Sequence, residues 1–391
     1  MHKKLILFVH QASEMYGSDK VLLFLAHGLQ MSTNFRPIVV IPDEGPLYGA
    51  LLAVGVEVHI GDVAKISRAV FSPAGIVRLT WQSYKAMRFL NRVVAGRAVA
   101  AVHSNTLAVL SGALWAKVRW VPHVWHVHEI ILSPRIVSKV FPFLVRLFAD
   151  RVISNSTVTE RWLLAEQPSL SAKSSVIFNG LPSVCKPSPE AIQLFRKKVN
   201  ASGGDVVLTI AGRINRWKGQ ELLLAAVTEL NHRGRAGALR LAIVGGPAPG
   251  LEDLPTALIS QAEDGGFGQR CTLMPFVDDI WPVWFGSDIA VVPSTEPEPF
   301  GMVAIEAMAA GIPVIAAAHG GLLDIVVDEV TGLLFEPRSV LALANAIDRL
   351  VTDVQLRRQL GEEGARRQRD LFSVLSQVQK TAAIYDELSN A

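Results

Sequence analysis

Short apolar runs alternate with amphipathic helical stretches along almost the whole chain, and this alternation constrains the fold more than any other feature. Such runs are typical of strands that are buried on both faces, and helical stretches between them are typical of connections in a parallel sheet. The predicted strands cover residues 5–9, 37–41, 56–60, 99–102, 121–125, 152–154, 175–178, 206–210, 239–244, 270–273, 289–292 and 313–316.

The alternation is interrupted once, over residues 179–189, where three prolines lie close together. A chain of 391 residues is long enough for two domains. We therefore predict an α/β fold with two Rossmann-like domains, residues 1–182 and 183–372, that face each other across a cleft. Ligands of such sheets bind at the carboxyl ends of the strands, which point into the cleft.

Residues 291–321 carry the most informative local pattern. An apolar strand runs up to Val292, a proline-rich turn follows, and a helix is predicted to open near Phe300 and to end at Gly311. The first amides of a helix have no internal partner and lie at the positive end of its dipole, so they form a natural anion site. The predicted anion site consists of the amides of Gly301, Met302 and Val303.

Two carboxylates, Glu298 and Glu306, bracket this anion site. Eight residues at the helical rise separate them by roughly 12 Å. A carboxylate pair that works on one glycosidic bond is about 5–9.5 Å apart, so this pair does not fit that role. The spacing instead suits the two ends of an extended ligand with an anionic middle, and a nucleotide-sugar has that form.

The same stretch resembles the E-x7-E motif of the retaining glycosyltransferases of family 4, which have the GT-B fold. The resemblance extends to Pro293-Ser294 before the motif and to residues 311–314 after it. It implies a metal-independent enzyme that moves a hexose from a nucleoside diphosphate sugar to a saccharide or lipid-linked acceptor, in cell-surface glycan biosynthesis. It also implies that the second domain binds the donor, that the first binds the acceptor, and that a last helix over residues 373–391 crosses back onto the first domain.

The resemblance assigns roles to individual residues of the second half. Residues 212–219 resemble the family's G-R-x4-K-G element, in which Arg213 and Lys218 would grip the donor diphosphate. Fixed cations at that place would stabilise the negative charge that develops on the leaving group. Glu298 would hold sugar hydroxyls and Glu306 the ribose. The predicted donor site also includes Phe300, Gly301, Met302 and Val303.

In the first half, Gly17 lies in a segment that resembles the family's small-residue loop near the donor. A histidine at a strand end contacts the transferred sugar in this family, and His128 is the predicted match. His126 is the alternative, because the two differ by one strand period. Three histidines within six residues also raise the alternative of a metal site. No cysteine lies near them and no Asp-x-Asp occurs in the chain, so we predict neither a metal nor another cofactor.

The charge balance and the length of the apolar runs limit which partners and which cellular compartment we expect. With 38 basic and 35 acidic residues the net charge is +3, which does not favour nucleic-acid binding. Two distant cysteines, Cys185 and Cys271, favour a reducing compartment. The first apolar run is too short for a signal peptide, and no run is long enough for a membrane span. These features predict a cytoplasmic protein.

Residues 75–97 combine five basic residues with many apolar and aromatic ones. One interpretation is a basic amphipathic helix that makes weak contact with an anionic membrane surface, which would place the protein peripherally at the inner membrane face. The other is a domain helix with a solvated basic face. Residues 136–148 have a similar character with a stronger resemblance to core.

Two alternative functions remain at this point. A sugar-nucleotide epimerase can share the GT-B fold, but it needs its own acid–base groups and no matching motif occurs. A non-catalytic sugar-nucleotide-binding protein would not need Arg213, Lys218 and both glutamates together. We therefore predict a hexosyltransferase.

Overall fold

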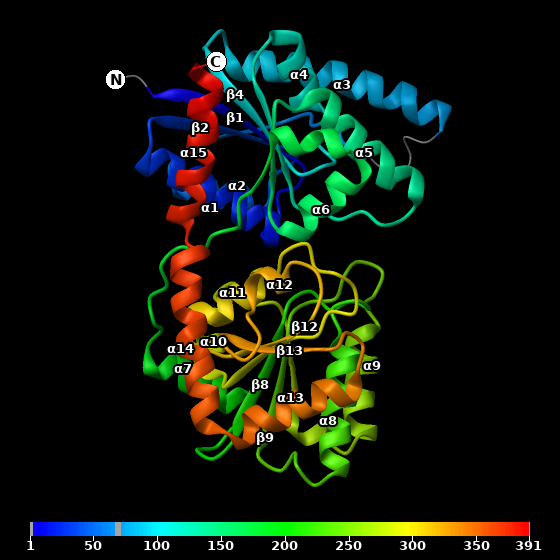
Figure 1. The fold of residues 1–391 in the computed structure, drawn as a ribbon, viewed down its shortest axis with the longest axis vertical. Coiled ribbons are helices and arrows are strands. Elements are labelled where there is room, and N and C mark those ends of the chain that lie inside the picture. The colour runs from blue at the N-terminus through cyan, green and yellow to red at the C-terminus, as the bar shows by residue number, and fades with distance from the viewer. Residues whose placement is uncertain (1–2, 67–71, 391) are drawn as a thin grey trace. The chain divides into compact units, whose positions relative to one another are not determined.

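The structure is a computed structural model that describes residues 3–66 and 72–390. The chain forms two compact units (Figure 1). Unit 1 comprises Met1–Pro182 together with Phe372–Ala391, and unit 2 comprises Ser183–Leu371. The α/β class with two Rossmann-like domains is confirmed, because each unit is built around its own parallel sheet.

In the described part of unit 1 the sheet has seven parallel strands, in the order β3-β2-β1-β4-β5-β6-β7. The strands are β1 (Lys4–His10), β2 (Phe35–Ile41), β3 (Glu57–Ile60), β4 (Val99–Asn105), β5 (His123–Val127), β6 (Arg151–Ser154) and β7 (Ser174–Val176). The helices are α1 (Gly17–Ser32), α2 (Pro46–Ala53), α3 (Pro73–Val94), α4 (Ser111–Arg119), α5 (Arg135–Phe148), α6 (Thr157–Glu166) and α15 (Val374–Asn390).

The alternation of side chains along β1 divides the core of unit 1 into layers. Ile6 and Phe8 pack with α1, α2 and α15, whereas Leu5, Leu7 and Val9 pack with α3 and α4. Period-two alternation is what a strand with helices on both faces requires. The opposite faces of β1 are therefore both apolar and both covered.

Helix α15 belongs to unit 1 although it is the last element of the chain. The Leu181 amide donates to the Phe372 carbonyl at 2.8 Å, and the Val374 amide donates to the Leu181 carbonyl at 3.0 Å. Gly180 lies so close to this crossing that a Cβ there would be 2.5 Å from the Ser373 carbonyl oxygen. From this point α15 runs beside α1 (Figure 1).

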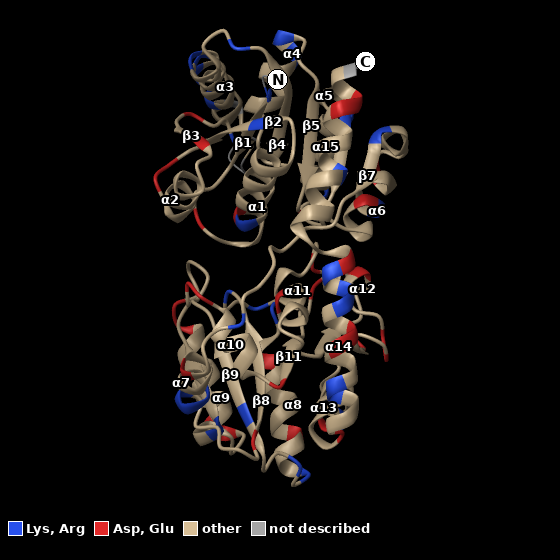
Figure 2. Cartoon of the chain, turned by 90° about the vertical axis from the view of Figure 1, so that its left-hand side faces the viewer, with Lys and Arg blue, Asp and Glu red and all other residues tan. Residues whose placement is uncertain are grey.

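Helix α3 has one buried and one exposed side. Its later residues Leu90, Val93 and Val94 are buried in the core, as a domain helix requires. Its earlier turns expose Val77, Trp81 and Tyr84, and Figure 2 shows Lys and Arg on the same helix. The later turns are therefore those of a domain helix, and membrane contact by the earlier turns stays a prediction. No helix in the described ranges is long and apolar enough to cross a membrane.

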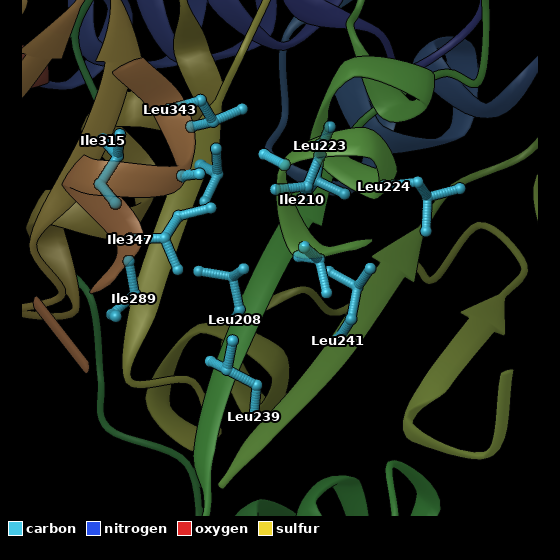
Figure 3. Close-up of a cluster of buried hydrophobic side chains, with 14 of the residues drawn as sticks. Leu208, Ile210, Leu223, Leu224, Leu239, Leu241, Ile289, Ile315, Leu343 and Ile347 are labelled. Carbon is cyan, nitrogen blue, oxygen red and sulfur yellow. The ribbon is translucent and has the colours of Figure 1, made fainter. Parts of the chain in front are cut away.

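All residues of unit 2 are described, and its sheet has six parallel strands in the order β10-β9-β8-β11-β12-β13. The strands are β8 (Val206–Ala211), β9 (Leu239–Val244), β10 (Cys271–Met274), β11 (Ile289–Val292), β12 (Val314–Ala317) and β13 (Gly332–Phe335). The helices are α7 (Pro189–Lys198), α8 (Gln220–His232), α9 (Leu254–Asp264), α10 (Trp281–Gly286), α11 (Met302–Ala309), α12 (Leu322–Ile325), α13 (Val340–Thr352) and α14 (Val354–Leu371). Figure 3 shows the core between β8, α8 and α13, where Leu208, Leu223 and Ile347 are fully buried.

The predicted strands differ from the observed ones in two informative places. The prediction of 121–125 is two residues early, because β5 begins at His123, after a proline that has no amide hydrogen to donate. The Pro122 carbonyl still accepts from the Val102 amide at 2.9 Å. Strand β13 was not predicted. It is an edge strand that begins with a glycine, and its apolar run is limited to Leu333, Leu334 and Phe335.

Four histidines at β4 and β5 of unit 1 are buried: His103, His123, His126 and His128. Burial lowers the pKa of His103, His126 and His128 well below the usual value, since a charged imidazole would lose its hydration. Burial also lowers the pKa of His123 to about 4, although its hydrogen bond to the Phe148 carbonyl opposes the shift. These four side chains are therefore neutral in the folded protein near pH 7.

We expect unit 1 to lose stability as the pH falls below about 6.5. In that range the histidines of the unfolded chain take up protons, whereas the buried histidines of the folded unit stay neutral. Each buried histidine contributes a slope of up to about 1.4 kcal/mol per pH unit, which for His123 continues down to about pH 4. Hydrogen exchange of β4 and β5 amides, corrected for intrinsic rates, measures this slope. His123→Gln should reduce it, and His232→Gln, at an exposed position, should not. Equal slopes in all three proteins would contradict the explanation.

Candidate functional site

In unit 2 the predicted donor residues lie on two loops that leave neighbouring strands at the same edge of the sheet. The loop after β8 holds Arg213 and Lys218, and the loop after β11 holds Glu298. The Thr295 amide donates to the Trp217 carbonyl at 2.7 Å. Gly219 has a φ of 82°, and a Cβ there would be 2.0 Å from the Pro293 carbonyl oxygen. The two loops therefore pack directly on each other, and this contact requires glycine.

The centre of this arrangement is an ion pair between the half-buried Lys218 and the buried Glu298. The Lys218 Nζ lies 2.6 Å from the Glu298 Oε1, and the Ser294 hydroxyl donates to the same oxygen at 2.6 Å. Only 4 % of Glu298 is exposed. The prediction placed these two residues at different parts of the donor, phosphate and sugar. The structure shows them in contact with each other.

The backbone of Glu298 is held by the segment after β12. The Gly321 amide donates to the Glu298 carbonyl at 2.7 Å, and a Cβ on Gly320 would be 2.5 Å from the same oxygen. The ring of His319 donates through Nε2 to the Ser294 carbonyl at 2.7 Å, and burial lowers the pKa of this histidine. Three segments of the chain thus fix one carboxylate.

Helix α11 begins at Met302, after Gly301 with a φ of 120°, two residues later than predicted. No side chain caps its first turn, so the amides of Met302 and Val303 point out of the helix end without a side-chain acceptor from the cap residue. The residue that ends the helix is close to the predicted one, since Gly311 has a φ of 76° just beyond the helix.

Glu306 and Phe300 are both buried on this side of unit 2, with 5 % and 3 % exposed. The Trp284 indole donates to the Glu306 Oε2 over a long 3.4 Å. Glu298 and Glu306 therefore have different surroundings, one with a cation and a hydroxyl, the other with an indole. Their assignment to different ends of a donor stays a prediction.

In unit 1 the predicted residue His128 lies one position after β5, beside the end of β4. Its Nε2 is 3.0 Å from the Oδ1 of Asn105, the last residue of β4. On the other side of Asn105 lies His10, the last residue of β1, whose Nε2 is 2.6 Å from the Asp19 carboxylate. Three neighbouring strands thus contribute to one buried polar cluster at their carboxyl ends.

His126, the alternative to His128, contacts a different set of residues. Its Nδ1 is 3.2 Å from the His103 Nε2, and the His103 Nδ1 is 2.6 Å from the hydroxyl of Tyr385 on α15. The rings of His126 and His128 face each other at 4.0 Å between centroids. Both candidates therefore belong to the same cluster.

The metal alternative for these histidines has no counterpart in the structure. Among residues 3–66 and 72–390, no group of three or more His, Cys, Asp or Glu side chains is arranged to hold a metal ion. Glu129, the nearest acid in the sequence, accepts hydrogen bonds from the amides of Leu107 and His128, each at 3.1 Å. Burial raises the pKa of Glu129.

Gly17, the remaining predicted donor residue, is the first residue of α1. The glycine does not adopt a left-handed backbone in the structure. The carboxylate of Asp19 accepts from the Tyr16 amide at 3.0 Å, so a negative charge already lies at this helix start. Contact of Gly17 with a donor stays a prediction.

Sequence reasoning missed several residues of these clusters, namely His10, Asp19, Asn105, Tyr385, Ser294 and His319. For His10 and Asn105 a signal was present, because each is the polar last residue of an apolar strand. Parallel strands end at one edge of the sheet, and these two residues are register partners there.

Comparison with known families matches both halves of the chain. A family model described as glycosyl transferases group 1 matches residues 191–367, and one described as glycosyltransferase family 4 matches residues 17–183. A D-inositol 3-phosphate glycosyltransferase of Nocardia farcinica is 33% identical over 215 residues, 54% of this chain and 47% of the relative. One of Salinispora arenicola is 31% identical over 249 residues, 61% of this chain and 55% of the relative. The chain thus spans about half the length of these curated relatives.

Among solved structures, HepE of Anabaena in complex with UDP and glucose superposes with a TM-score of 0.84 and 25% identity. The match covers 98% of this chain and 100% of HepE. WaaG, a glycosyltransferase involved in lipopolysaccharide biosynthesis, shows the same fold with a TM-score of 0.66 at 15% identity, covering 97% of this chain and 99% of WaaG. The sheets, the matched models and these neighbours agree, and the chain belongs to the GT-B glycosyltransferases of family 4.

Proposed function

We propose that this glycosyltransferase is retaining and metal-independent, and that it moves a hexose from a nucleoside diphosphate sugar to a saccharide or lipid-linked acceptor of cell-surface glycan synthesis. The observation that carries the proposal is the Lys218–Glu298 pair, whose carboxylate lies in the loop that leads into α11. It combines a cation, a buried carboxylate and helix-start amides at the carboxyl ends of β8 and β11. The complex of HepE with UDP and glucose supports a donor of this class.

Each group of unit 2 has a role that fits its chemistry. Arg213, Lys218 and the amides at the start of α11 bind the diphosphate and stabilise its charge as it leaves. Glu298 accepts hydrogen bonds from sugar hydroxyls, and Glu306 from the ribose. A buried carboxylate accepts strong hydrogen bonds, because it competes with little water.

Unit 1 binds the acceptor and offers His128 to the transferred sugar. In a retaining transfer without an enzymic nucleophile, the bond from the anomeric carbon to the diphosphate breaks while the acceptor oxygen attacks from the same face. The departing phosphate oxygen takes the proton of the acceptor hydroxyl. Charges that stabilise the diphosphate therefore assist the cleavage of this bond.

The proposed acceptor is presented at an anionic membrane face. The α3 face, defined as Val77, Arg78, Trp81, Tyr84, Lys85, Arg88 and Arg92, combines exposed apolar and basic side chains. The Lys85 Nζ lies 3.6 Å from the centroid of the Trp81 ring. Arg119 of the neighbouring α4 donates to Asn91 of α3 at 2.7 Å, and the adjacent Trp120 is 90 % exposed. Aromatic and basic side chains side by side suit a lipid headgroup region.

Removing either cation of the β8 loop should weaken binding of a nucleoside diphosphate. A charge-assisted hydrogen bond contributes about 1.5–3 kcal/mol, so Arg213→Ala and Lys218→Ala should each reduce affinity by about 10-fold to 100-fold. Calorimetry with UDP, GDP and ADP measures this. Arg216→Ala, an exposed position on the same loop, is the control. Unchanged affinity in both variants, or loss of binding in a chelator, would refute a cationic metal-free site.

The two glutamates should respond differently to loss of charge. Glu306→Gln should weaken both the free diphosphate and the nucleotide-sugar. Glu298→Gln should spare or slightly strengthen the diphosphate, since it removes a negative charge next to Lys218, while it weakens the nucleotide-sugar or turnover. Glu296→Gln, exposed and two residues away, should change neither. If Glu298→Gln impairs the diphosphate and Glu306→Gln spares it, the two ends are assigned in reverse.

The α3 face should bind anionic vesicles in a salt-dependent way. Each exposed cation near an anionic surface contributes about 1 kcal/mol, and the attraction decays within about 8 Å at physiological salt. Co-sedimentation should show a preference for phosphatidylglycerol over phosphatidylcholine vesicles that disappears at high salt.

Two matched variants test this surface, because each reverses the charge of two arginines, one variant on α3 and the other on α14. Charge reversal by Arg88→Glu with Arg92→Glu on α3 should remove the preference. The same reversal by Arg358→Glu with Arg369→Glu, exposed on α14, should retain it. Equal loss in both would mean that net charge and not the α3 face attracts the protein. No preference at low salt would remove the membrane claim and leave the donor claim intact.

A further inference from the structure

The histidine cluster of unit 1 contains two buried ring nitrogens that have no hydrogen-bonding partner among the described residues. They are the His126 Nε2 and the His128 Nδ1. Buried polar atoms are nearly always hydrogen-bonded, so each such exception needs an explanation. The protonation state of each nitrogen can be worked out from the partners on the other side of its ring.

For His126 the argument starts at Tyr385. Its hydroxyl is fully buried, and burial raises the pKa of this phenol well above the usual value, so it keeps its proton. Within the described residues its hydrogen-bonding partner is the His103 Nδ1 at 2.6 Å, and it donates there. His103 then carries its proton on Nε2 and donates it to the His126 Nδ1 at 3.2 Å. His126 is therefore protonated at Nε2, the atom without a partner.

For His128 the argument starts at Asn105. The Asn105 side-chain nitrogen lies 3.1 Å from the His10 Nδ1 and 3.4 Å from the Ser18 carbonyl oxygen. The carbonyl oxygen can only accept, so the amide group is oriented with its NH2 toward Ser18 and His10. Its oxygen then faces the His128 Nε2 at 3.0 Å and accepts a hydrogen bond from the Nε2–H group. The neutral ring of His128 is therefore bare at Nδ1, the atom without a partner.

The two orphan atoms are thus complementary, a donor on His126 and an acceptor on His128, and their rings face each other at 4.0 Å between centroids. A hydroxyl group both donates and accepts one hydrogen bond, and it would satisfy both atoms at once. A third buried polar atom without a partner lies at the end of the neighbouring strand β4. Thr106 has a φ of 127°, a strained value for a β-branched residue, and its hydroxyl oxygen is also buried without a partner.

We propose that Tyr385 and Asn105 are positioning residues that fix His126 as a hydrogen-bond donor and His128 as an acceptor, so that the pair binds one hydroxyl group of a sugar. The inference rests on the proposed function for the identity of the ligand. It extends that function by giving the last helix of the chain a part in recognition. It also assigns both histidines, which the sequence left as alternatives, to one site.

The ring tautomers provide a test that does not depend on activity. Long-range 1H–15N spectra of the full chain with 15N-labelled histidine distinguish protonated from bare ring nitrogens. In the unaltered protein both His126 and His128 should carry the proton on Nε2. Tyr385→Phe should disturb the tautomers of His103 and His126 and leave that of His128 unchanged. Asn105→Leu should disturb the tautomer of His128 and leave that of His126 unchanged, with Asn105→Ala as a smaller alternative if the leucine variant does not fold. Tyr48→Phe, on α2 of the same unit, should disturb neither.

Binding measurements then test the hydroxyl. UDP-glucose and its monodeoxy analogues probe a hydroxyl of the donor, and methyl α-glucoside added to UDP-saturated protein probes one of an acceptor sugar. One hydrogen bond corresponds to about a threefold to tenfold change in affinity. Tyr385→Phe should weaken the binding of either UDP-glucose or methyl α-glucoside by about threefold to tenfold and leave UDP binding unchanged. If the hydroxyl belongs to the donor, one monodeoxy analogue of UDP-glucose should bind the unaltered protein and Tyr385→Phe with equal affinity.

Three results would decide against parts of the proposal. A His126 ring that is bare at Nε2 in the unaltered protein overturns the donor assignment. Loss of stability in Tyr385→Phe, with unchanged tautomers and unchanged sugar binding, makes Tyr385 a structural residue only. Equal binding of every deoxy analogue and of the glucoside, in both proteins, overturns hydroxyl recognition. Predicted tautomers in a chain that binds no nucleotide-sugar support the positioning roles and contradict the proposed function instead.

Discussion

A parallel sheet brings the carboxyl ends of all its strands to one edge, and the candidate functional groups of both units depend on that constraint. In unit 2 the edge brings together Lys218 and Glu298, which lie on the loops that follow the neighbouring strands β8 and β11. In unit 1 it brings together His10, Asn105 and His128 at the ends of β1, β4 and β5. The apolar strands supply stability, and the residues directly after them are available for chemistry.

Both edges bury polar groups, and most buried polar groups need hydrogen-bonding partners. Unit 2 does so with close backbone contacts, since Gly219 and Gly320 lie where a Cβ would collide with the neighbouring loop. Unit 1 does so with neutral rings, because a chain of imidazoles can pass hydrogen bonds along without carrying charge. The acid sensitivity expected for unit 1 is a consequence of burying these neutral imidazoles. A glycine contact does not titrate, whereas an imidazole does.

Local sequence pattern predicted the elements well and the contacts between distant residues poorly. Strands β9 and β11 were predicted to the residue, because each is a proline-free and mostly apolar run with clear ends. The motif of residues 291–321 indicated the family, and the matched family models confirm it. The pairing of Lys218 with Glu298 joins residues 80 positions apart, and that of Tyr385 with His103 joins residues 282 apart. No periodicity or spacing encodes such contacts, since they follow from how whole elements pack.

The Lys218–Glu298 contact also changes how the proposed donor site is charged. Two opposite charges in contact present little net charge to a ligand a few ångströms away, although each alone would interact by about 4 kcal/mol at 4 Å in a partly screened site. In the proposed donor site Lys218 would therefore be shared between the phosphate and the Glu298 carboxylate. A ligand that draws Lys218 toward its phosphate leaves the Glu298 oxygen available to a sugar hydroxyl. Phosphate binding and sugar binding would then be coupled through one lysine, and a diphosphate without its sugar would leave the carboxylate without a compensating hydrogen bond.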